Sequence, residues 1–273
     1  MTSSTSPAPR ATGTDKLLIE VSDKIALVTI NNPQKRNALS REIREALPGA
    51  LAALDTDPDV RVLVVTGAGD KAFASGADIS EFAALRTTPA ARAEYDRDQA
   101  ALTTAWASFG KPVIAMIRGF CMGGGLLTAL QADIRIAADD SQFGIPAARL
   151  GLGYGFSSVT ALLSLVTPAR AAEILFSARR FPAVEALQMG LVNRVVSPDD
   201  LRAEVMSLAA GIAANAPLTV AAAKAAIREA AKPPQSHDLA QVEAMIEACF
   251  RSEDYHEGQR AFAEKRPPVF SGR

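Results

Sequence analysis

Residues 112–131 read PVIAMIRGFCMGGGLLTALQ, and this stretch decides the fold more than any other. Val113 to Ile117 is a continuous apolar run, which is typical of a strand that is covered on both faces. Three glycines at 123–125 then predict a turn, and the residues from Gly123 to Gln131 predict a helix. Another strand is expected from Ile134 to Ala137. The order of strand, turn, helix and strand indicates an α/β fold of stacked layers.

The same arrangement is expected in the preceding part of the chain. Val60 to Val65 is a second continuous apolar run, and glycine-rich turn residues follow it at 66–69. Two shorter strands, Leu17–Val21 and Ile25–Ile30, flank a polar turn and predict a hairpin. Between the hairpin and the apolar run, Ser40 is a candidate N-cap, and apolar residues recur at helical spacing at Ile43, Leu47, Leu51 and Leu54. We therefore expect residues 14–197 to form one core of β-β-α units, with a less regular pattern towards its end.

The composition of the chain changes at Pro198, where the strand patterns end. Ala-rich helical segments are expected over residues 199–214, 218–231, 238–252 and 255–265. Such helices pack closely, so residues 198–273 are expected to form a helical layer that covers the core or joins subunits. Residues 1–13 contain mainly Ser, Thr, Pro and Ala and are expected to be a flexible tail.

Composition excludes several classes of function. The net charge of −1 gives no basic field for binding nucleic acid. Cys121 and Cys249 match no metal-ligand spacing and are expected to be free thiols in a reducing compartment, so we expect no metal site. The N-terminal residues lack the apolar segment of a signal peptide, and no later run reaches membrane-span length. A cytoplasmic protein without a membrane partner is expected.

Two glycine-centred turns carry the chemistry. Residues 74–78 (Ala-Ser-Gly-Ala-Asp) and residues 123–125 each follow a buried-strand pattern, so both turns are able to aim backbone N–H groups at one developing negative charge. An enolate formed from a thioester concentrates charge on its carbonyl oxygen, and removing one fixed donor from such a site costs about 3 kcal/mol. This pattern favours acyl-transfer or enolate chemistry.

Five motifs in the same order give the chain a resemblance to a known family. They are NNPQKRNAL at 31–39, AFASGADI at 72–79, KPVIA at 111–115 running to the glycines at 123–125, QFGIP at 142–146 and GLVN at 190–193. Together they resemble the enoyl-CoA hydratase/isomerase (crotonase) family over nearly the whole chain after the tail. The resemblance implies a spiral of β-β-α units with a C-terminal helical layer, assembled as trimers or pairs of trimers. It also implies a CoA thioester as substrate, with no further cofactor.

The resemblance also implies roles for individual residues. The N–H groups of Ala77 and Gly124 would form the oxyanion hole. The neighbouring residues expected to line the thioester are Ala74, Gly76, Asp78, Ile79, Ser80 and Gly123. Lys35 and Arg36 would lie near the nucleotide end of CoA, and Lys265 with Phe262 would reach CoA from an adjoining subunit. For the three cations, a solvated surface charge is the alternative.

The chain departs from the family at the residues that handle protons. Hydratases of the family hold water with two glutamates, and the corresponding positions here are Leu127 and Ala147. A positioned acid or base contributes roughly 10²- to 10⁴-fold, so ordinary hydration is expected to be crippled. Decarboxylation of a malonyl-type thioester needs no base to form the enolate, so it fits these residues best.

Several further possibilities stay open from the sequence. Tyr154 resembles in position a tyrosine of the family's methylmalonyl-CoA decarboxylases, although it is also expected as a packing residue of its loop. Asp78 and Glu81 are possible substitute bases, but Asp78 is expected to stabilise the start of the next helix and Glu81 to be solvated. Arg149 is a possible partner for a substrate carboxylate. The rival functions are a hydratase or isomerase with another base, and a catalytically silent CoA-binding scaffold.

Overall fold

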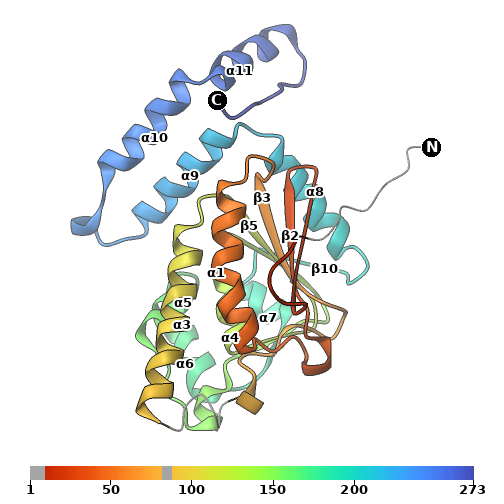
Figure 1. The fold of residues 1–273 in the computed structure, drawn as a ribbon, viewed down its shortest axis with the longest axis vertical. Coiled ribbons are helices and arrows are strands. Elements are labelled where there is room, and N and C mark those ends of the chain that lie inside the picture. Colours follow the sequence, from red (N-terminus) through yellow and green to blue (C-terminus); the bar gives the residue numbers. More distant parts are fainter. Residues whose placement is uncertain (1–9, 82–87) are drawn as a thin grey trace.

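The computed structural model describes residues 10–81 and 88–273, and within them it contains two sheets and a layer of C-terminal helices (Figure 1). The larger sheet has six strands in the order β1-β2-β3-β5-β7-β10, and the smaller has four in the order β4-β6-β8-β9. The larger sheet consists of β1 (Leu17–Ser22), β2 (Ile25–Ile30), β3 (Val62–Gly67), β5 (Val113–Ile117), β7 (Ile134–Ala138) and β10 (Arg194–Val196). The smaller sheet consists of β4 (Ala72–Ala74), β6 (Phe120–Met122), β8 (Gln142–Gly144) and β9 (Phe181–Pro182).

From β3 to β8, consecutive strands alternate between the two sheets. β3, β5 and β7 are parallel neighbours in the larger sheet, and β4, β6 and β8 are parallel neighbours in the smaller one. Each turn of the chain therefore gives one strand to each sheet before a helix follows, as β5 and β6 do before α4 (Gly124–Leu130). This arrangement confirms the predicted stack of β-β-α units. Among the described strands, only the pairs β1–β2 and β8–β9 are antiparallel.

Both faces of the larger sheet are buried, which explains its continuous apolar runs. Along β3, the side chains of Val62 and Val64 belong to a core cluster with α8 (Leu201–Ala213). Leu63 and Val65 point to the opposite face and join the main core between the sheets and helices. Because successive side chains of a strand point to opposite faces, a strand between two cores needs an apolar residue at every position.

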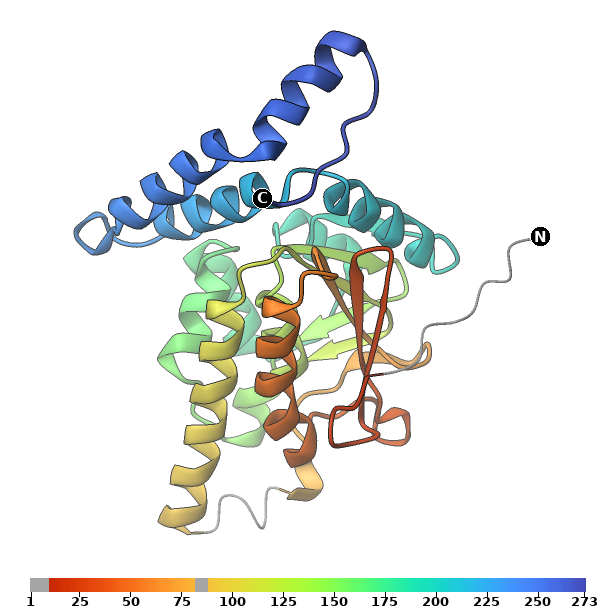
Figure 2. The same cartoon turned by 45° about the horizontal axis from the view of Figure 1, so that its top comes forward.

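The helices that cover the main core include α3 (Pro89–Ser108), for which the sequence indicates an apolar helix around Trp106 but not its bounds. α1 (Arg41–Thr56) begins after Ser40 as expected, although no hydrogen bond from the Ser40 side chain caps the helix. α3 lies beside α1 (Figures 1 and 2). Its buried residues, such as Leu102 and Trp106, are few among many alanines and charges, so it has no clear apolar stripe. The later core helices are α5 (Phe156–Leu163), α6 (Pro168–Ser177) and α7 (Ala183–Gln188).

Four helices follow the core, as the sequence predicts. They are α8, α9 (Pro217–Ala230), α10 (Leu239–Arg251) and α11 (Glu253–Glu264). Ser252 separates α10 from α11, and its hydroxyl accepts a hydrogen bond from the Tyr255 N–H at 3.1 Å. α10 and α11 stand away from the two sheets at one end of the molecule (Figures 1 and 2).

Two further observations concern the ends of the chain and its helices. The predicted tail, residues 1–13, lies mostly outside the described residues, but the Arg10 N–H donates to the Ile19 carbonyl of β1 at 2.9 Å.

In the described part of the chain, no single helix has the length and apolar character to cross a membrane, and only the pair α8 and α9, bent by 106°, meets these criteria jointly.

Candidate functional site

The carboxyl ends of β4 and β6 lie side by side at one edge of the smaller sheet. The two strands pair in parallel, with Ala72 opposite Phe120 and Ala74 opposite Cys121. The chain leaves β4 through residues 75–77 and leaves β6 through residues 123 and 124. Since parallel strands end at the same edge, the two turns that the sequence singled out meet there.

Distances around the glycines show how closely these turns approach each other. A Cβ atom built on Gly124 would lie 3.5 Å from the amide nitrogen of Ala77, and one built on Gly76 would lie 3.5 Å from the amide nitrogen of Gly124. Gly76 has a φ of 105° and Gly123 a φ of 49°, in the region that residues with side chains rarely adopt. Glycine at these positions therefore permits both the conformation of the turns and their close approach.

The amide groups of Ala77 and Gly124 are available as donors. Within residues 10–81 and 88–273, neither N–H group has a hydrogen-bond acceptor. Gly124 is the first residue of α4, where an N–H group has no partner inside the helix. Two unpaired donors thus lie near each other at the edge of the smaller sheet.

The side chains at positions 127 in α4 and 147 after β8 are apolar. The Gly123 N–H donates to the Gly144 carbonyl at 2.8 Å, so the end of β8 lies against the glycine turn. Ala147 follows within η3 (Pro146–Leu150) and is buried. Leu127 lies one helical turn after Gly123, and its N–H donates to the Gly123 carbonyl at 3.0 Å. Neither residue is able to transfer a proton.

Tyr154 supplies a buried hydroxyl. Its ring packs against the main core, and its Oη atom is buried without a hydrogen-bond partner in the described part of the chain. The Leu152 N–H donates to the Ala147 carbonyl at 3.0 Å, which holds the loop before Tyr154 against η3. Burial raises the pKa of the Tyr154 hydroxyl above its usual value, so the phenol stays neutral.

Asp78 is held in a structural ion pair. Its carboxylate accepts from Lys35 Nζ at 2.7 Å and from the Ser80 N–H at 3.0 Å and the Ser80 hydroxyl at 2.7 Å. Burial acts to raise the pKa of Asp78, but the hydrogen bonds from Lys35 and Ser80 outweigh it and leave the pKa below its usual value. Asp78 thus caps the short helix η2 (Ile79–Glu81), in agreement with the expectation that it stabilises the following helix start.

Glu81 was predicted to be a solvated charge, but its carboxylate contacts α1. Its carboxylate accepts from the Arg41 N–H, the first amide of α1, at 2.9 and 3.2 Å. It also faces Arg44 Nη2 at 3.6 Å. The unpaired amides of a helix start attract a carboxylate, and Arg44 is only 3% exposed, so Glu81 is drawn inward.

Arg44 is a residue of the site region that the sequence analysis missed. Its Nη1 donates to the Leu39 carbonyl at 2.7 Å. Leu39 forms a parallel bridge with Ala77, and its N–H donates to the Gly76 carbonyl at 2.8 Å. Arg44 directly follows Ile43 of the apolar stripe of α1. An arginine at the border of an apolar stripe was the sequence feature that could have indicated its burial.

The remaining predicted site residues are spread more widely. Ala74 is the buried last residue of β4, and the Ile79 side chain lies outside the described residues. Arg36 is exposed and lies over the Phe120 ring at 5.2 Å. Phe262 and Lys265 lie at the end of α11, which is far from α4 in Figures 1 and 2. Arg149 is exposed on η3, with no ion pair among the described residues.

Candidate metal ligands are not gathered in this region. Across residues 10–81 and 88–273, no group of three or more His, Cys, Asp or Glu side chains is placed to hold a metal ion. Both cysteines are free thiols, and Cys121 is buried in the core.

Known proteins resemble this chain along almost its whole length. The family model for enoyl-CoA hydratase/isomerase matches residues 20–273. A crotonyl-CoA hydratase of Syntrophomonas wolfei is 35% identical, covering 94% of this chain and 98% of that protein. An (E)-benzylidenesuccinyl-CoA hydratase of Thauera aromatica is 36% identical, covering 93% of this chain and 98% of that protein.

A solved structure is similar to this chain in both fold and sequence. The enoyl-CoA hydratase/carnithine racemase of Magnetospirillum magneticum has a TM-score of 0.89 and 36% identity, and it covers 95% of this chain and 97% of its own. The alternation of strands between two sheets and the C-terminal helices therefore correspond to the fold that the motifs implied. The chain belongs to the enoyl-CoA hydratase/isomerase (crotonase) family and is an acyl-CoA enzyme of that family.

Proposed function

We propose that the chain binds an acyl-CoA whose thioester oxygen accepts hydrogen bonds from Ala77 and Gly124, and that its reaction is decarboxylation of a malonyl-type thioester. The observation that carries this proposal is the pair of unpaired N–H groups at the edge of the smaller sheet. Leu127 and Ala147 are apolar, while Asp78 and Glu81 are engaged with cations and helix starts. A reaction that needs donors but no base fits this set of residues.

The proposed step balances without a base. The bond between the α-carbon and the carboxylate breaks, CO2 leaves, and the bonding electrons move into the thioester to give the enolate. The two N–H groups stabilise the negative oxygen, at about 3 kcal/mol for each donor. The α-carbon then takes a proton, for which water is the source. The neutral hydroxyl of Tyr154 orients the departing carboxylate, a role supported by its buried and unpartnered Oη.

Two assays on the purified protein test the proposal. Release of CO2 from malonyl-CoA and methylmalonyl-CoA is measured beside hydration of crotonyl-CoA. We expect CO2 release that depends on Gly124 and Tyr154, and hydration at least about a hundred-fold weaker than decarboxylation, since both acid–base positions are lost. Hydration that exceeds decarboxylation would overturn the proposal.

Hydration is the second candidate function, because the relatives include enzymes named as hydratases and dehydratases. In that case a substitute base is required, and Glu81 and Asp78 are the carboxylates that follow Ala77 in sequence. Glu81→Gln and Asp78→Asn are then compared in the hydration of crotonyl-CoA. The substitution that abolishes hydration identifies the base, and the other substitution is expected to leave hydration intact. A third outcome, in which CoA thioesters bind without turnover over the whole panel, would identify a CoA-binding scaffold.

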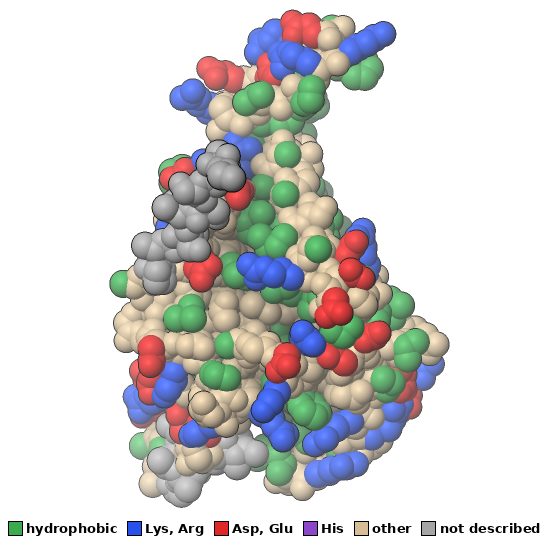
Figure 3. Space-filling view, turned by 90° about the vertical axis from the view of Figure 1, so that its right-hand side faces the viewer, with side chains coloured by type: hydrophobic (Ala, Val, Ile, Leu, Met, Phe, Trp, Pro, Cys, Tyr) green, Lys and Arg blue, Asp and Glu red, His purple; other side chains and the backbone are tan. Residues whose placement is uncertain are grey.

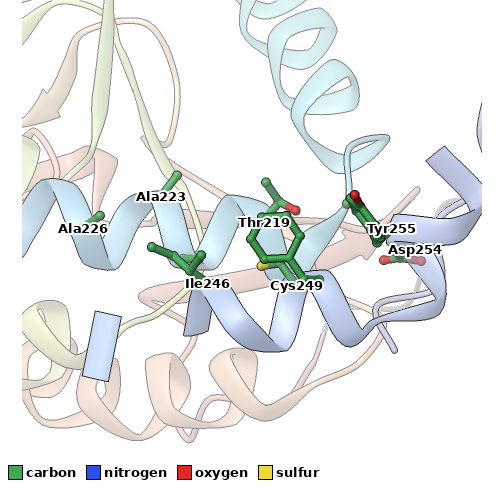
Figure 4. Close-up of a pocket in the computed structure, with 10 residues that line it drawn as sticks. Thr219, Ala223, Ala226, Ile246, Cys249, Asp254 and Tyr255 are labelled. Atoms are coloured by element: carbon green, nitrogen blue, oxygen red, sulfur yellow. The ribbon is translucent and has the colours of Figure 1, made fainter. Parts of the chain in front are cut away.

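We further propose that the helices α9 to α11 join three copies of the chain. A groove of about 470 Å³ lies between α9 and α10, and Thr219, Ile246 and Cys249 are among the residues that line it (Figure 4). Large apolar side chains of this layer are exposed, among them Ile227 at 72% and Phe262 at 88%. Exposed apolar surface of this kind marks an interaction site. In a trimer, the end of α11 with Lys265 would be free to reach the site of an adjoining subunit.

The mass in solution tests this second proposal. Light scattering after size exclusion is expected to give three or six times the chain mass of 28.7 kDa. A charge in the groove, as in Ile246→Glu, is expected to shift the protein toward the monomer. A wild-type protein that stays monomeric at high concentration would contradict the proposal.

A further inference from the structure

Arg44 of α1 is a buried cation that contacts three separate segments of the chain. Its Nη1 donates to the Leu39 carbonyl, just before α1, at 2.7 Å. Its Nη2 faces the Glu81 carboxylate of η2 at 3.6 Å. Its guanidinium carbon lies 5.0 Å from the ring centroid of Tyr95 in α3. One side chain therefore links the segment before α1, the segment that follows the first glycine turn, and α3.

Leu39 connects Arg44 with the two glycine turns. Leu39 forms a parallel bridge with Ala77, and its N–H donates to the Gly76 carbonyl at 2.8 Å. Its side chain also approaches the second turn, since a Cβ atom built on Gly124 would lie 3.7 Å from Leu39 Cδ1. A displacement of Leu39 would therefore move the amide of Ala77 relative to that of Gly124.

Glu81 fastens the same segment at its other end. It lies four residues after Ala77, and its carboxylate accepts from the Arg41 N–H at 2.9 and 3.2 Å. Arg44 brings a positive charge to the same carboxylate. The segment from Gly76 to Glu81 is thus attached to the start of α1 at both of its ends, and Arg44 contributes to each attachment.

Stability alone does not explain this arginine. Charged side chains are spread over the surface of the protein, as Figure 3 shows for one face, whereas Arg44 is only 3% exposed. Among the described residues, its Nε and Nη2 atoms have no hydrogen-bond partner. A buried donor without a partner destabilises a fold, and an apolar side chain of similar volume often replaces a buried ion pair without loss of stability. The position of the segment that Arg44 fastens is the better explanation.

From these contacts we propose that Arg44 is a positioning residue, which keeps the Ala77 N–H close enough to the Gly124 N–H for both to donate to one thioester oxygen. The inference rests on the proposed function to the extent that these two amides are the donors. It does not depend on which reaction follows, because hydration and decarboxylation would both use the polarised carbonyl. A donor that moves by about 1 Å is enough to slow a reaction by up to roughly 10²-fold.

Infrared spectroscopy of bound acetyl-CoA with an isotope-labelled thioester carbonyl tests the position of the donors directly. Hydrogen bonds to the carbonyl lower its stretching frequency, so wild-type protein is expected to shift the band on binding. In Arg44→Met, we expect about half of that frequency shift, because one of the two donors is displaced. For CO2 release, kcat is expected to fall about ten-fold, while KM changes by less than about three-fold. The melting temperature is expected to equal or exceed that of the wild type.

Arg135→Met is the matched control, because Arg135 of β7 is also 3% exposed. Unlike Arg44, it donates to backbone carbonyls through both Nε and Nη1, the former to Leu191 at 2.8 Å. Its replacement is expected to lower the melting temperature and to leave the frequency shift and kcat unchanged. Arg44→Lys keeps a charge beside Glu81 and is expected to recover part of the shift. It also carries the test if Arg44→Met does not fold.

The outcomes separate this inference from the proposed function. If the full frequency shift and the wild-type kcat persist in both Arg44 variants, the inference is overturned and the proposed function stands. An equal loss of the shift in Arg135→Met would also overturn it, because any buried arginine would then have the same effect. A shift that is reduced in Arg44→Met, in a protein that releases no CO2, supports the positioning role and contradicts decarboxylation. A wild-type protein that binds acetyl-CoA without any shift would contradict both.

Discussion

The glycine edge of the smaller sheet, formed by residues 74–77 and 123–125, and the C-terminal helical layer differ in the room that they leave for an added side chain. At the edge, a Cβ atom built on Gly125 would lie 2.2 Å from the carbonyl oxygen of Ala74, which no packing adjustment accommodates cheaply. In the helical layer, a Cβ on Gly211 would meet no atom within 4 Å. The first region is constrained by the path of the backbone. The second region presents side chains to its surroundings and leaves them room to vary.

The largest effect is expected from Gly125→Ala, which introduces a methyl group where α4 touches β4. We expect the free energy of unfolding to fall by about 3–5 kcal/mol, because the new atom meets backbone rather than a movable side chain. Urea unfolding followed by circular dichroism measures the change. Gly49→Ala is the control, since Gly49 lies inside α1 with open space around it and should not destabilise the protein.

The next largest effect is expected from removing one donor at the edge. Gly124→Pro deletes the N–H group at the first position of α4, where proline is compatible with a helix. Turnover of the acyl-CoA substrate is expected to fall roughly 10²- to 10³-fold, the cost of one lost oxyanion donor. Steady-state kinetics measures this loss, and a folded variant that keeps wild-type turnover would show that Gly124 does not contact the reacting oxygen.

Much of the fold was predictable because the periodicity of the core strands is unambiguous. The hairpin of β1 and β2, the buried strands β3, β5 and β7 and the four C-terminal helices all follow from the pattern of apolar residues. The bounds of α3 were not predictable, since its many alanines and charges hide the few residues that it buries. The separation of strands into two sheets was not predicted, because strand pairing is a tertiary property.

The site was predictable only where the backbone determines it. Gly76 and Gly123 predict turns after two strands, so Ala77 and Gly124 were expected to lie close together. Their amide nitrogens do lie near each other. The partners of charged side chains were not, because ion pairs join residues far apart in sequence. The inward position of Glu81 therefore follows only from the folded structure.

Tyr154→Phe is expected to change activity and stability in opposite directions. The hydroxyl is buried and unpartnered in the described structure, so its removal should raise the free energy of unfolding by up to about 1 kcal/mol. If the hydroxyl orients the substrate carboxylate, kcat for CO2 release falls roughly ten-fold or more. Measuring both properties on one preparation is decisive, because lower stability with unchanged kcat would identify a purely structural tyrosine.

The Asp78–Lys35 pair predicts a pH dependence of stability at the glycine edge. The pKa of Asp78 in the folded protein lies below its unfolded value of about 3.9, so its contribution is present above that pH and is lost as the pH falls through the folded pKa. Since Lys35 is half-exposed, Asp78→Asn is expected to cost about 1 kcal/mol at pH 7. The difference between the two proteins should shrink below pH 4, and a difference that is constant with pH would exclude the ion pair as its cause.

The smallest effect is expected from Gly211→Ala, which is the counterpart of Gly125→Ala in the helical layer. Gly211 lies inside α8 and is exposed, so alanine should raise the free energy of unfolding by about 0.5–1 kcal/mol through its higher helix propensity. Urea unfolding at several protein concentrations measures it. A loss of stability that appears only at high concentration would mean that another copy of the chain packs against Gly211. In that case the helical layer has room for an added side chain only on the surface outside its contacts between subunits. The contrast with the glycine edge would then hold for that surface alone.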